Sequence, residues 1–432
     1  MKTFFQRQSP VRLIALGFVL TILAGSLLLC LPCSVKEGVT LPYIDALYTA
    51  TSAVCVTGLV AADAGDTFTA LGQFFLGLLI HIGGLGVTSV GAGVIIVMGG
   101  RVNLKGRSLI REAMNLDSGK GIVHLVKDVF VTTVIFEGIG AALCFPVFLR
   151  DHSLPRALGI SIFHSVAAFN NAGFDILGNM QSLIPYRDDV LLNLVTCVLI
   201  FFGGIGFLVI REMRTKRLQW KRYSMHAKVV LSMSLFLIVA GTLLFRLTED
   251  MTWLEALFQS VSARTAGFST YSIGELSNAG LIVMILLMCI GASPGSTGGG
   301  IKTSTLLVLV QGIRSAATNE SEKAFRYAIP RDAFRKAAVI ALLALTVVTT
   351  GTYLLSVLEP QLALRDVLFE VASAYGTAGL STGISPGLGV GAKLVSIVIM
   401  YIGRLGPLTV VSLWHFSRGE RVRFPEGNIA IG

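Results

Sequence analysis

The sequence has few charged residues: they make up 14% of its 432 positions, while apolar residues make up 53%. A mean hydropathy of +0.75 is more than a soluble core of this size needs, which argues against a soluble globular protein. The charges sum to +10, but they collect in short segments between apolar runs and form no basic face beside aromatic residues. This distribution indicates a membrane protein in contact with lipid, and no nucleic-acid partner.

Cysteine and histidine are also scarce, with six of each. The cysteines lie mostly within apolar stretches and have no paired spacing, which argues against a disulfide framework or a Cys-rich metal site. No cluster of His, Asp and Glu shares a helix face, so we find no catalytic residues and expect neither an enzyme nor an organic cofactor. The first apolar run lacks a small-x-small cleavage site, and we expect an uncleaved spanning helix.

Eight apolar runs reach the roughly 20 residues that a membrane-spanning helix needs. They cover about 11–31, 71–98, 126–149, 190–210, 227–247, 279–310, 336–357 and 393–416. Lys and Arg concentrate after the second and fourth runs and before the seventh, in segments 101–120, 211–222 and 323–336. The positive-inside rule predicts that these connections and both termini are cytoplasmic, in a multi-pass protein of the cytoplasmic membrane.

The apolar runs form four consecutive pairs, and the connection between the two runs of each pair is predicted to face outward. Each of these outward connections holds a short apolar segment that ends near a glycine. The four segments end in Cys-Val-Thr-Gly-Leu (55–59), Asn-Asn-Ala-Gly-Phe (170–174), Arg-Thr-Ala-Gly-Phe (264–268) and Gly-Thr-Ala-Gly-Leu (376–380). They recur about every hundred residues, which indicates a fourfold repeat. Three copies also carry an acid upstream: Asp45, Glu255 and Asp366. We therefore predict an all-α polytopic membrane protein with eight transmembrane helices and four re-entrant pore helices around a pseudo-fourfold axis.

A segment too short to span must be a half-helix whose end faces protein or a wet cavity, because lipid cannot satisfy backbone groups. Acids suit its positive end, while its opposite end favours a cation. Beyond it, glycine permits an extended backbone whose carbonyls could replace the hydration shell of a monovalent cation. The alternative is that each glycine only turns a re-entrant loop, and four copies at matching depth argue against it. The predicted filter comprises Val56, Thr57, Gly58, Asn171, Ala172, Gly173, Thr265, Ala266, Gly267, Thr377, Ala378 and Gly379.

The sixth apolar run is interrupted at 291–302 by five glycines and a proline, which cannot hold a continuous helix. We expect this irregular segment to lie in the pore below the filter. A phosphate-binding loop is disfavoured because Ile301 separates Gly300 from Lys302 and no strand precedes the segment. Arg404 lies about a dozen residues into the last run, where a charge requires a partner or water and indicates function.

Other polar residues give weaker signals. For Arg264, an effect on the electrostatics of the outer mouth and a local hydrogen bond to carbonyls are both open, and we do not expect it to bind the ion. His81 and Glu137 could belong to a proton or sodium path, although a packing hydrogen bond is favoured. Asn170 and Asn171 are expected to hold the second filter strand. The glycine runs 83–86 and 203–206 are expected to permit close packing or a bend.

With its four filter glycines at 58, 173, 267 and 379, the chain resembles the Trk/Ktr/HKT superfamily of potassium transporters over nearly its full length. It most resembles the membrane subunit of the Ktr type, because its sequence begins about ten residues before the first helix of the pore. A glycine at position 58 then favours potassium, whereas serine there goes with sodium permeation in the plant relatives. The resemblance implies bacterial potassium uptake, a homodimer and a separate cytoplasmic ring subunit that binds ATP or ADP. Sodium remains open as a second ion.

The resemblance also implies an intramembrane gate at the glycine-rich loop. The gate residues would be Gly291, Ala292, Ser293, Pro294, Gly295, Ser296, Thr297, Gly298, Gly299, Gly300, Lys302 and Arg404. The predicted division is 1–70 and 71–125 for the first repeat, 126–226 for the second, 227–335 for the third, and 336–432 for the fourth with the C-terminus. Two alternatives remain: a Trk-type pore, and a secondary transporter of another small cation, which would require two inverted repeats.

Overall fold

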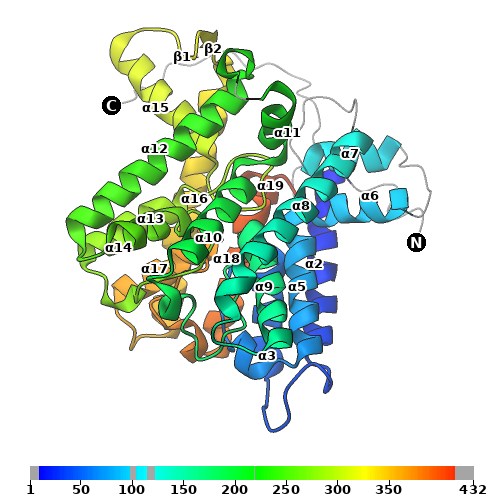
Figure 1. Cartoon of the computed structure of the whole chain (residues 1–432). Helices are drawn as coiled ribbons and strands as arrows, with labels where there is room; N and C mark the ends of the chain where they lie inside the picture. Colours follow the sequence, from blue (N-terminus) through cyan, green and yellow to red (C-terminus); the bar gives the residue numbers. More distant parts are fainter. Residues whose placement is uncertain (1–8, 98–103, 114–121, 218, 414–432) are drawn as a thin grey trace.

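The computed structural model describes residues 9–97, 104–113, 122–217 and 219–413, and these residues are mostly helical (Figure 1). Predicted basic positions such as Arg101 and Lys120, and the C-terminal segment beyond residue 413, lie outside the described residues. The strands among them are β1 (Lys323–Ala324) and β2 (Tyr327–Ala328), which form one short antiparallel hairpin. This hairpin, α7 (Leu104–Ala113) and α11 (Phe207–Lys216) lie at the top of Figure 1, and the segment after α2 lies at the bottom. The basic connections therefore gather at one end of the molecule.

Four long helices each begin one of the expected repeats. They are α2 (Pro10–Leu29), α8 (Ile122–Phe148), α12 (Met225–Thr248) and α16 (Arg331–Leu358). Each is long and apolar enough to cross a membrane. Ser9 and Ser224 cap the first turns of α2 and α12 by accepting hydrogen bonds from backbone N–H groups.

The second helix of every repeat is broken. The pairs of pieces are α5 (Ala70–Leu85) and α6 (Val87–Val97), α10 (Val190–Ile205) and α11, α14 (Asn278–Cys289) and α15 (Thr303–Thr318), and α18 (Val390–Leu405) and α19 (Pro407–Ser412). The α10–α11 pair bends by 101°. Gly86, Gly206 and Gly406 stand at three of the breaks with φ of 82–90°, which a right-handed helix cannot contain. The sequence predicted the interruption of the sixth run and allowed a bend at 83–86 and 203–206, whereas the break at Gly406 in the eighth run was not foreseen.

A short buried helix lies between the two helices of each repeat. These helices are α3 (Tyr43–Cys55), α9 (Leu154–Phe169), α13 (Trp253–Ser262) and α17 (Leu364–Gly376). Asp45, Glu255 and Asp366 lie in first turns, where a negative charge suits the helix dipole. Glu255 also completes a capping box with Thr252.

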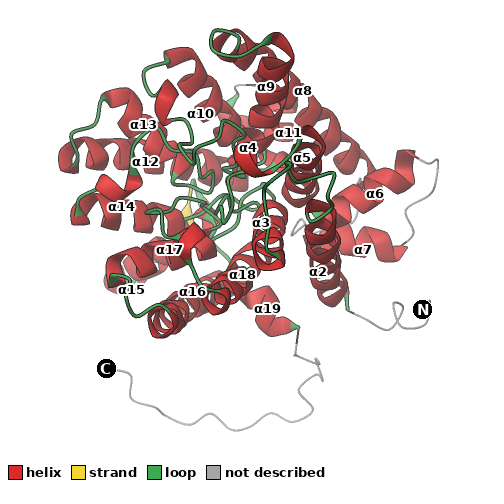
Figure 2. Cartoon of the chain, turned by 90° about the horizontal axis from the view of Figure 1, so that it is seen from below, coloured by secondary structure: helices red, strands yellow, loops and turns green. Residues whose placement is uncertain are grey.

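The four units contact one another in a closed order. Helix α5 packs against the short helix of its own unit, α3, and against that of the next, α9. Helix α10 likewise contacts α9 and α13, α14 contacts α17, and α18 contacts both α17 and α3. Figure 2 shows the result: the loops that follow the short helices meet in the middle, and helices surround them.

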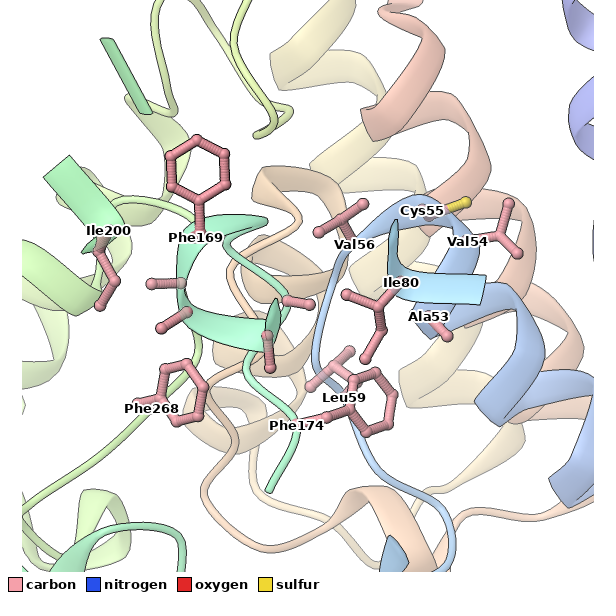
Figure 3. Packing of buried hydrophobic residues seen from close by; sticks show 14 of the residues in the cluster. Ala53, Val54, Cys55, Val56, Leu59, Ile80, Phe169, Phe174, Ile200 and Phe268 are labelled. Carbon is pink, nitrogen blue, oxygen red and sulfur yellow. The ribbon is translucent and has the colours of Figure 1, made fainter. Parts of the chain in front are cut away.

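The remaining short elements lie in the connections. They are α4 (Ala64–Thr67) and four 3₁₀ turns at Ile184–Tyr186, Trp220–Arg222, Ile273–Glu275 and Ser385–Gly387. A large apolar side chain follows each central glycine and anchors the segment: Leu59, Phe174, Phe268 and Leu380 are 0–2% exposed. Figure 3 shows the first three of them among the side chains packed around the central loops. The hydrophobic core therefore holds the central segments in place.

Candidate functional site

The four predicted filter glycines meet at one point in cyclic order. A Cβ atom built on Gly58 would lie 2.6 Å from the carbonyl oxygen of Ala172, and one on Gly173 would lie 2.7 Å from that of Ala266. The corresponding distances are 2.8 Å from Gly267 to Ala378 O and 2.2 Å from Gly379 to Thr57 O, which closes the circle. All four glycines have φ between 65° and 96°. Neither the space nor the backbone angle accepts a side chain here.

The residue two positions before each glycine has a left-handed backbone. These residues are Val56, Asn171, Thr265 and Thr377, with φ of 49–78°. Each turns the chain out of a short helix, and the N–H of the following residue bonds back to the last turn of that helix, as in Thr57 N to Ser52 O at 2.7 Å. The carboxyl ends of four helices therefore lie next to the four extended segments. The structure brings together all twelve predicted filter residues, and all of them except the half-buried Gly379 are buried.

Side chains tie these segments to their surroundings. The Ser52 hydroxyl accepts a hydrogen bond of 3.0 Å from the N–H of Gly58, and the Ser262 hydroxyl donates to the carbonyl of Phe268. A hydrogen bond of 3.1 Å joins the side chains of Asn171 and Thr265, which belong to neighbouring segments. These contacts fix the backbone of the central segments.

Two cavities lie on either side of this point. One has a volume of about 290 Å³ and is lined by all four glycines together with the acidic side chains of Asp63 and Asp175. The other has a volume of about 400 Å³ and is lined by residues of the glycine-rich loop and by Lys302 and Arg404. We call the first of these the outer cavity and the second the inner cavity.

The glycine-rich loop lies directly against two of the central segments. A Cβ atom on Gly298 would lie 2.3 Å from the hydroxyl of Thr265, and one on Gly299 would lie 2.5 Å from that of Thr377. The N–H of Gly299 donates to the Thr377 hydroxyl at 2.9 Å. The loop also bonds the broken end of α10, where Thr297 N donates to Gly203 O at 3.2 Å. Its conformation is therefore tied both to the central segments and to the break in a neighbouring helix.

Arg404 bridges this loop and a different broken helix. Its guanidinium donates to the carbonyl of Thr297 in the loop and to the carbonyls of Gly83 and Gly84 at the end of α5. The sequence indicated that Arg404 needs a partner or water, and the structure provides carbonyl partners in both the loop and α5. The ammonium of Lys302 donates to Gly298 O at 2.7 Å, within the loop itself.

Two buried ionisable side chains that were not predicted from the sequence lie in or beside the short helices. Lys393 in α18 pairs with Asp45 in α3 at 2.6 Å, with side chains only 7% and 15% exposed. Glu370 in α17 is fully buried and accepts hydrogen bonds from Ser381 and Ser385, which line the outer cavity. A lysine in an apolar run was the available signal for the pair.

The weaker candidates take up local hydrogen bonds. Arg264 is buried and donates to the carbonyl and hydroxyl of Ser234 in α12, at 3.0 and 3.2 Å, and it does not line the outer cavity. Its local hydrogen bonds match one of the two alternatives left open by the sequence. His81 and Glu137 contact each other at 3.1 Å, and Glu137 also contacts Asn170.

Comparison with known proteins shows which family this chain belongs to. The family model "TrkH: Cation transport protein" matches residues 17–248 and 229–416. The chain is 37% identical to the potassium/sodium uptake protein NtpJ of Enterococcus hirae, over 99% of this chain and 98% of that one. It is 35% identical to the Ktr system potassium uptake protein B of Bacillus subtilis, over 99% and 97%. Similarity in fold extends to the potassium transporter TrkH from Vibrio parahaemolyticus, with a TM-score of 0.74 over 95% of this chain and 86% of that one at 20% identity. The chain therefore belongs to the TrkH family of cation transport proteins.

Proposed function

We propose that this protein takes up potassium across the cytoplasmic membrane as the ion-conducting subunit of a Ktr-type system. The observation that carries the proposal is the cyclic close approach of four glycines, each facing a carbonyl of the next unit. The relatives support it, since their names give potassium or potassium and sodium as what they take up. They are transporters, and this protein is likewise a transporter rather than an enzyme.

In this proposal the filter is a ring of backbone carbonyls from 56–58, 171–173, 265–267 and 377–379. Carbonyl oxygens replace the water that a potassium ion loses on entry. The carboxyl ends of α3, α9, α13 and α17 add partial negative charge on the side from which each segment starts. Potassium is the main ion, and sodium stays open as a second one because a relative is named for both.

The gate in this proposal is the loop at 291–302 together with Arg404. The loop lies against the central segments on the side of the inner cavity, where it stands in the path of an ion that leaves the filter. The Arg404 guanidinium holds the loop to α5, so a shift of α5 or α18 would move the loop. Such a shift is the means by which a regulator would open the pore.

We further propose a homodimer and a separate cytoplasmic ring subunit that binds ATP or ADP. Support comes from the relatives named as members of a Ktr system, a name that implies further subunits. The basic segments gathered at one end of the molecule are the surface that the ring would meet. The positive-inside rule predicts that both termini lie on the same side of the membrane as these segments. A Trk-type pore remains the second candidate and differs in regulator and oligomeric state. An alternating-access transporter is disfavoured because the four units contact one another in cyclic order.

The test is growth and potassium uptake in a bacterium deficient in potassium uptake that carries this chain with a Ktr-type ring subunit. Gly58→Ser should lower the potassium-to-sodium ratio roughly tenfold, ~1.4 kcal/mol of discrimination, because the new side chain meets the carbonyl of Ala172. Arg404→Ala should change the rate of uptake without changing that ratio.

The controls are Gly159→Ser, at an exposed glycine of α9 with open space around it, and Arg187→Ala in an exposed ion pair. Neither should change the rate or the ratio. Absence of potassium uptake by well-expressed wild type, with Ktr-type or Trk-type regulators, would sink the proposal.

A further inference from the structure

A half-buried carboxylate, Glu137, with a side chain 12% exposed, lies behind the second filter segment and plays no part in the proposed pore. Glu137 stands within α8, among apolar residues of a helix long enough to span the membrane. A charge at such a position is costly unless it is paired, so its partners indicate its purpose. Glu137 and His81 line neither the outer nor the inner cavity, which separates them from the ion path.

The partners of Glu137 come from two directions. Its carboxylate accepts a hydrogen bond of 2.8 Å from the side-chain amide of Asn170 and contacts Nδ1 of His81 in α5 at 3.1 Å. Its backbone carbonyl accepts a hydrogen bond of 2.7 Å from the hydroxyl of Ser165. Ser165 and Asn170 lie in and just after the last turn of α9, so Glu137 holds that turn at two points.

Asn170 connects this anchor to the filter. It is fully buried and directly precedes Asn171, the left-handed residue that turns the chain into the second filter segment. Its side chain also fills the space beside α5, because a Cβ atom on Gly84 would lie 2.1 Å from Asn170 Oδ1. The carbonyl of Gly84 is in turn one of the acceptors of Arg404. The same asparagine therefore sets the start of the filter segment and packs against the helix end that holds the gate arginine.

We infer that Glu137 is a positioning residue for cation selectivity, which acts through Asn170 on the second filter segment. This inference rests on the proposed potassium pore. A carboxylate suits the position because it only accepts hydrogen bonds, and both side chains that point to it offer N–H groups when His81 Nδ1 carries its proton. Hydrogen bonds to a charged group are about twice as strong as neutral ones, which keeps the Asn170 side chain in one orientation.

The experiment measures uptake of potassium, rubidium and sodium by the full chain with its ring subunit, for Glu137→Gln, Glu137→Leu, Asn170→Ala and the double variant Glu137→Leu with Asn170→Ala. Glu137→Leu should lower the potassium-to-sodium ratio roughly tenfold, the factor that corresponds to loss of one hydrogen bond to a charged group. Glu137→Gln keeps an acceptor and should lie between wild type and Glu137→Leu. The double variant should be no worse than Asn170→Ala alone, because both changes break the same contact.

The control is Thr346→Val, a polar residue on an exposed face of α16 whose hydroxyl bonds only within its own helix. It should leave the ratio unchanged. The inference fails if correctly inserted Glu137→Gln and Glu137→Leu both keep the wild-type ratio, or if they change only the pH dependence of uptake, which would indicate a proton path. Absence of uptake by wild type would instead count against the proposed pore, so the two failures are distinguishable.

Discussion

At the scale of single residues, several ionisable side chains within the apolar helices form an ion pair or hydrogen bonds with another element. Lys393 and Asp45 join the second helix of the last unit to the short helix of the first, which closes the cyclic order of the four units. Arg404 spans from the loop to α5, and Glu137 in α8 contacts His81 in α5. Each of these side chains links two elements that are distant in sequence. Polar groups within the membrane therefore serve as cross-links between units.

We expect Asp45→Asn or Lys393→Gln alone to destabilise the protein by about 3–5 kcal/mol, because each leaves its partner as an unpaired buried charge. The double variant should be less destabilised than the sum of the two. Thermal unfolding of the purified protein in detergent checks this. The exposed pair Arg187 and Asp188 provides the comparison, and changes there should cost at most about 1 kcal/mol. Additive losses in the Asp45 and Lys393 cycle would contradict the assignment.

The sequence predicted site residues best at positions where the local backbone conformation accepts only one type of residue. The four central glycines could be found from the sequence because each needs a positive φ and a close carbonyl, and the pattern occurs four times. The acids of the first helical turns were predictable from the helix dipole. The partners of Arg404 in α5, the Lys393 pair and the surroundings of Glu370 were not, because they depend on how units distant in the sequence pack together.

At the scale of elements, the main difference from the sequence-based expectation is that the second helix of each of the four repeats is broken. Three breaks follow the same pattern, Gly-X-Leu-Gly or Gly-X-Ile-Gly, at 83–86, 203–206 and 403–406. A bend was predicted as possible at the first two of these positions. The third was not predicted, because the segment around Arg404 was interpreted only as the site of a charge within an apolar run. The break at 206 also contacts the glycine-rich loop, since the N–H of Phe207 donates to the carbonyl of Gly295 at 3.1 Å.

Gly206→Ala should therefore destabilise the protein by about 1–3 kcal/mol, the range for a left-handed non-glycine residue, and should alter the rate of uptake. Its Cβ would lie 2.6 Å from the carbonyl of Pro294, so the loop would have to move. Gly138→Ala in α8 is the matched control, since nothing lies within 4 Å of its added Cβ. Unfolding midpoints and initial uptake rates measure both. A Gly206→Ala protein with wild-type stability and rate would show that the break does not require this glycine.

At the scale of the whole molecule, one end carries the basic connections and the other carries the segments after the first helix of each unit. The positive-inside rule then assigns the two ends to the two sides of the membrane. Free cysteines offer a direct check. Cys33 is exposed after α2, whereas Cys55, Cys144 and Cys197 are buried.

A membrane-impermeant maleimide added to intact cells should label wild type at Cys33, and Cys33→Ser should remove the label. Thr215→Cys in the Cys33→Ser background should be labelled only after the membrane is permeabilised, because residue 215 is exposed on α11 at the opposite end. Gel shift with a polyethylene glycol maleimide measures both. Labelling of residue 215 in intact cells would reverse the orientation.

The break shared by all second helices bears on how a gate could arise by duplication of one ancestral unit. The first, second and fourth units have a single glycine with positive φ at the break. The third unit has the longer segment between α14 and α15 at the same place. Since neither half of a broken helix depends on the other for its backbone hydrogen bonds, a copy can lengthen this joint without shifting the halves. The proposed gate would then be an elaborated version of a joint that every copy shares, and one unit could specialise while the other three kept their symmetry.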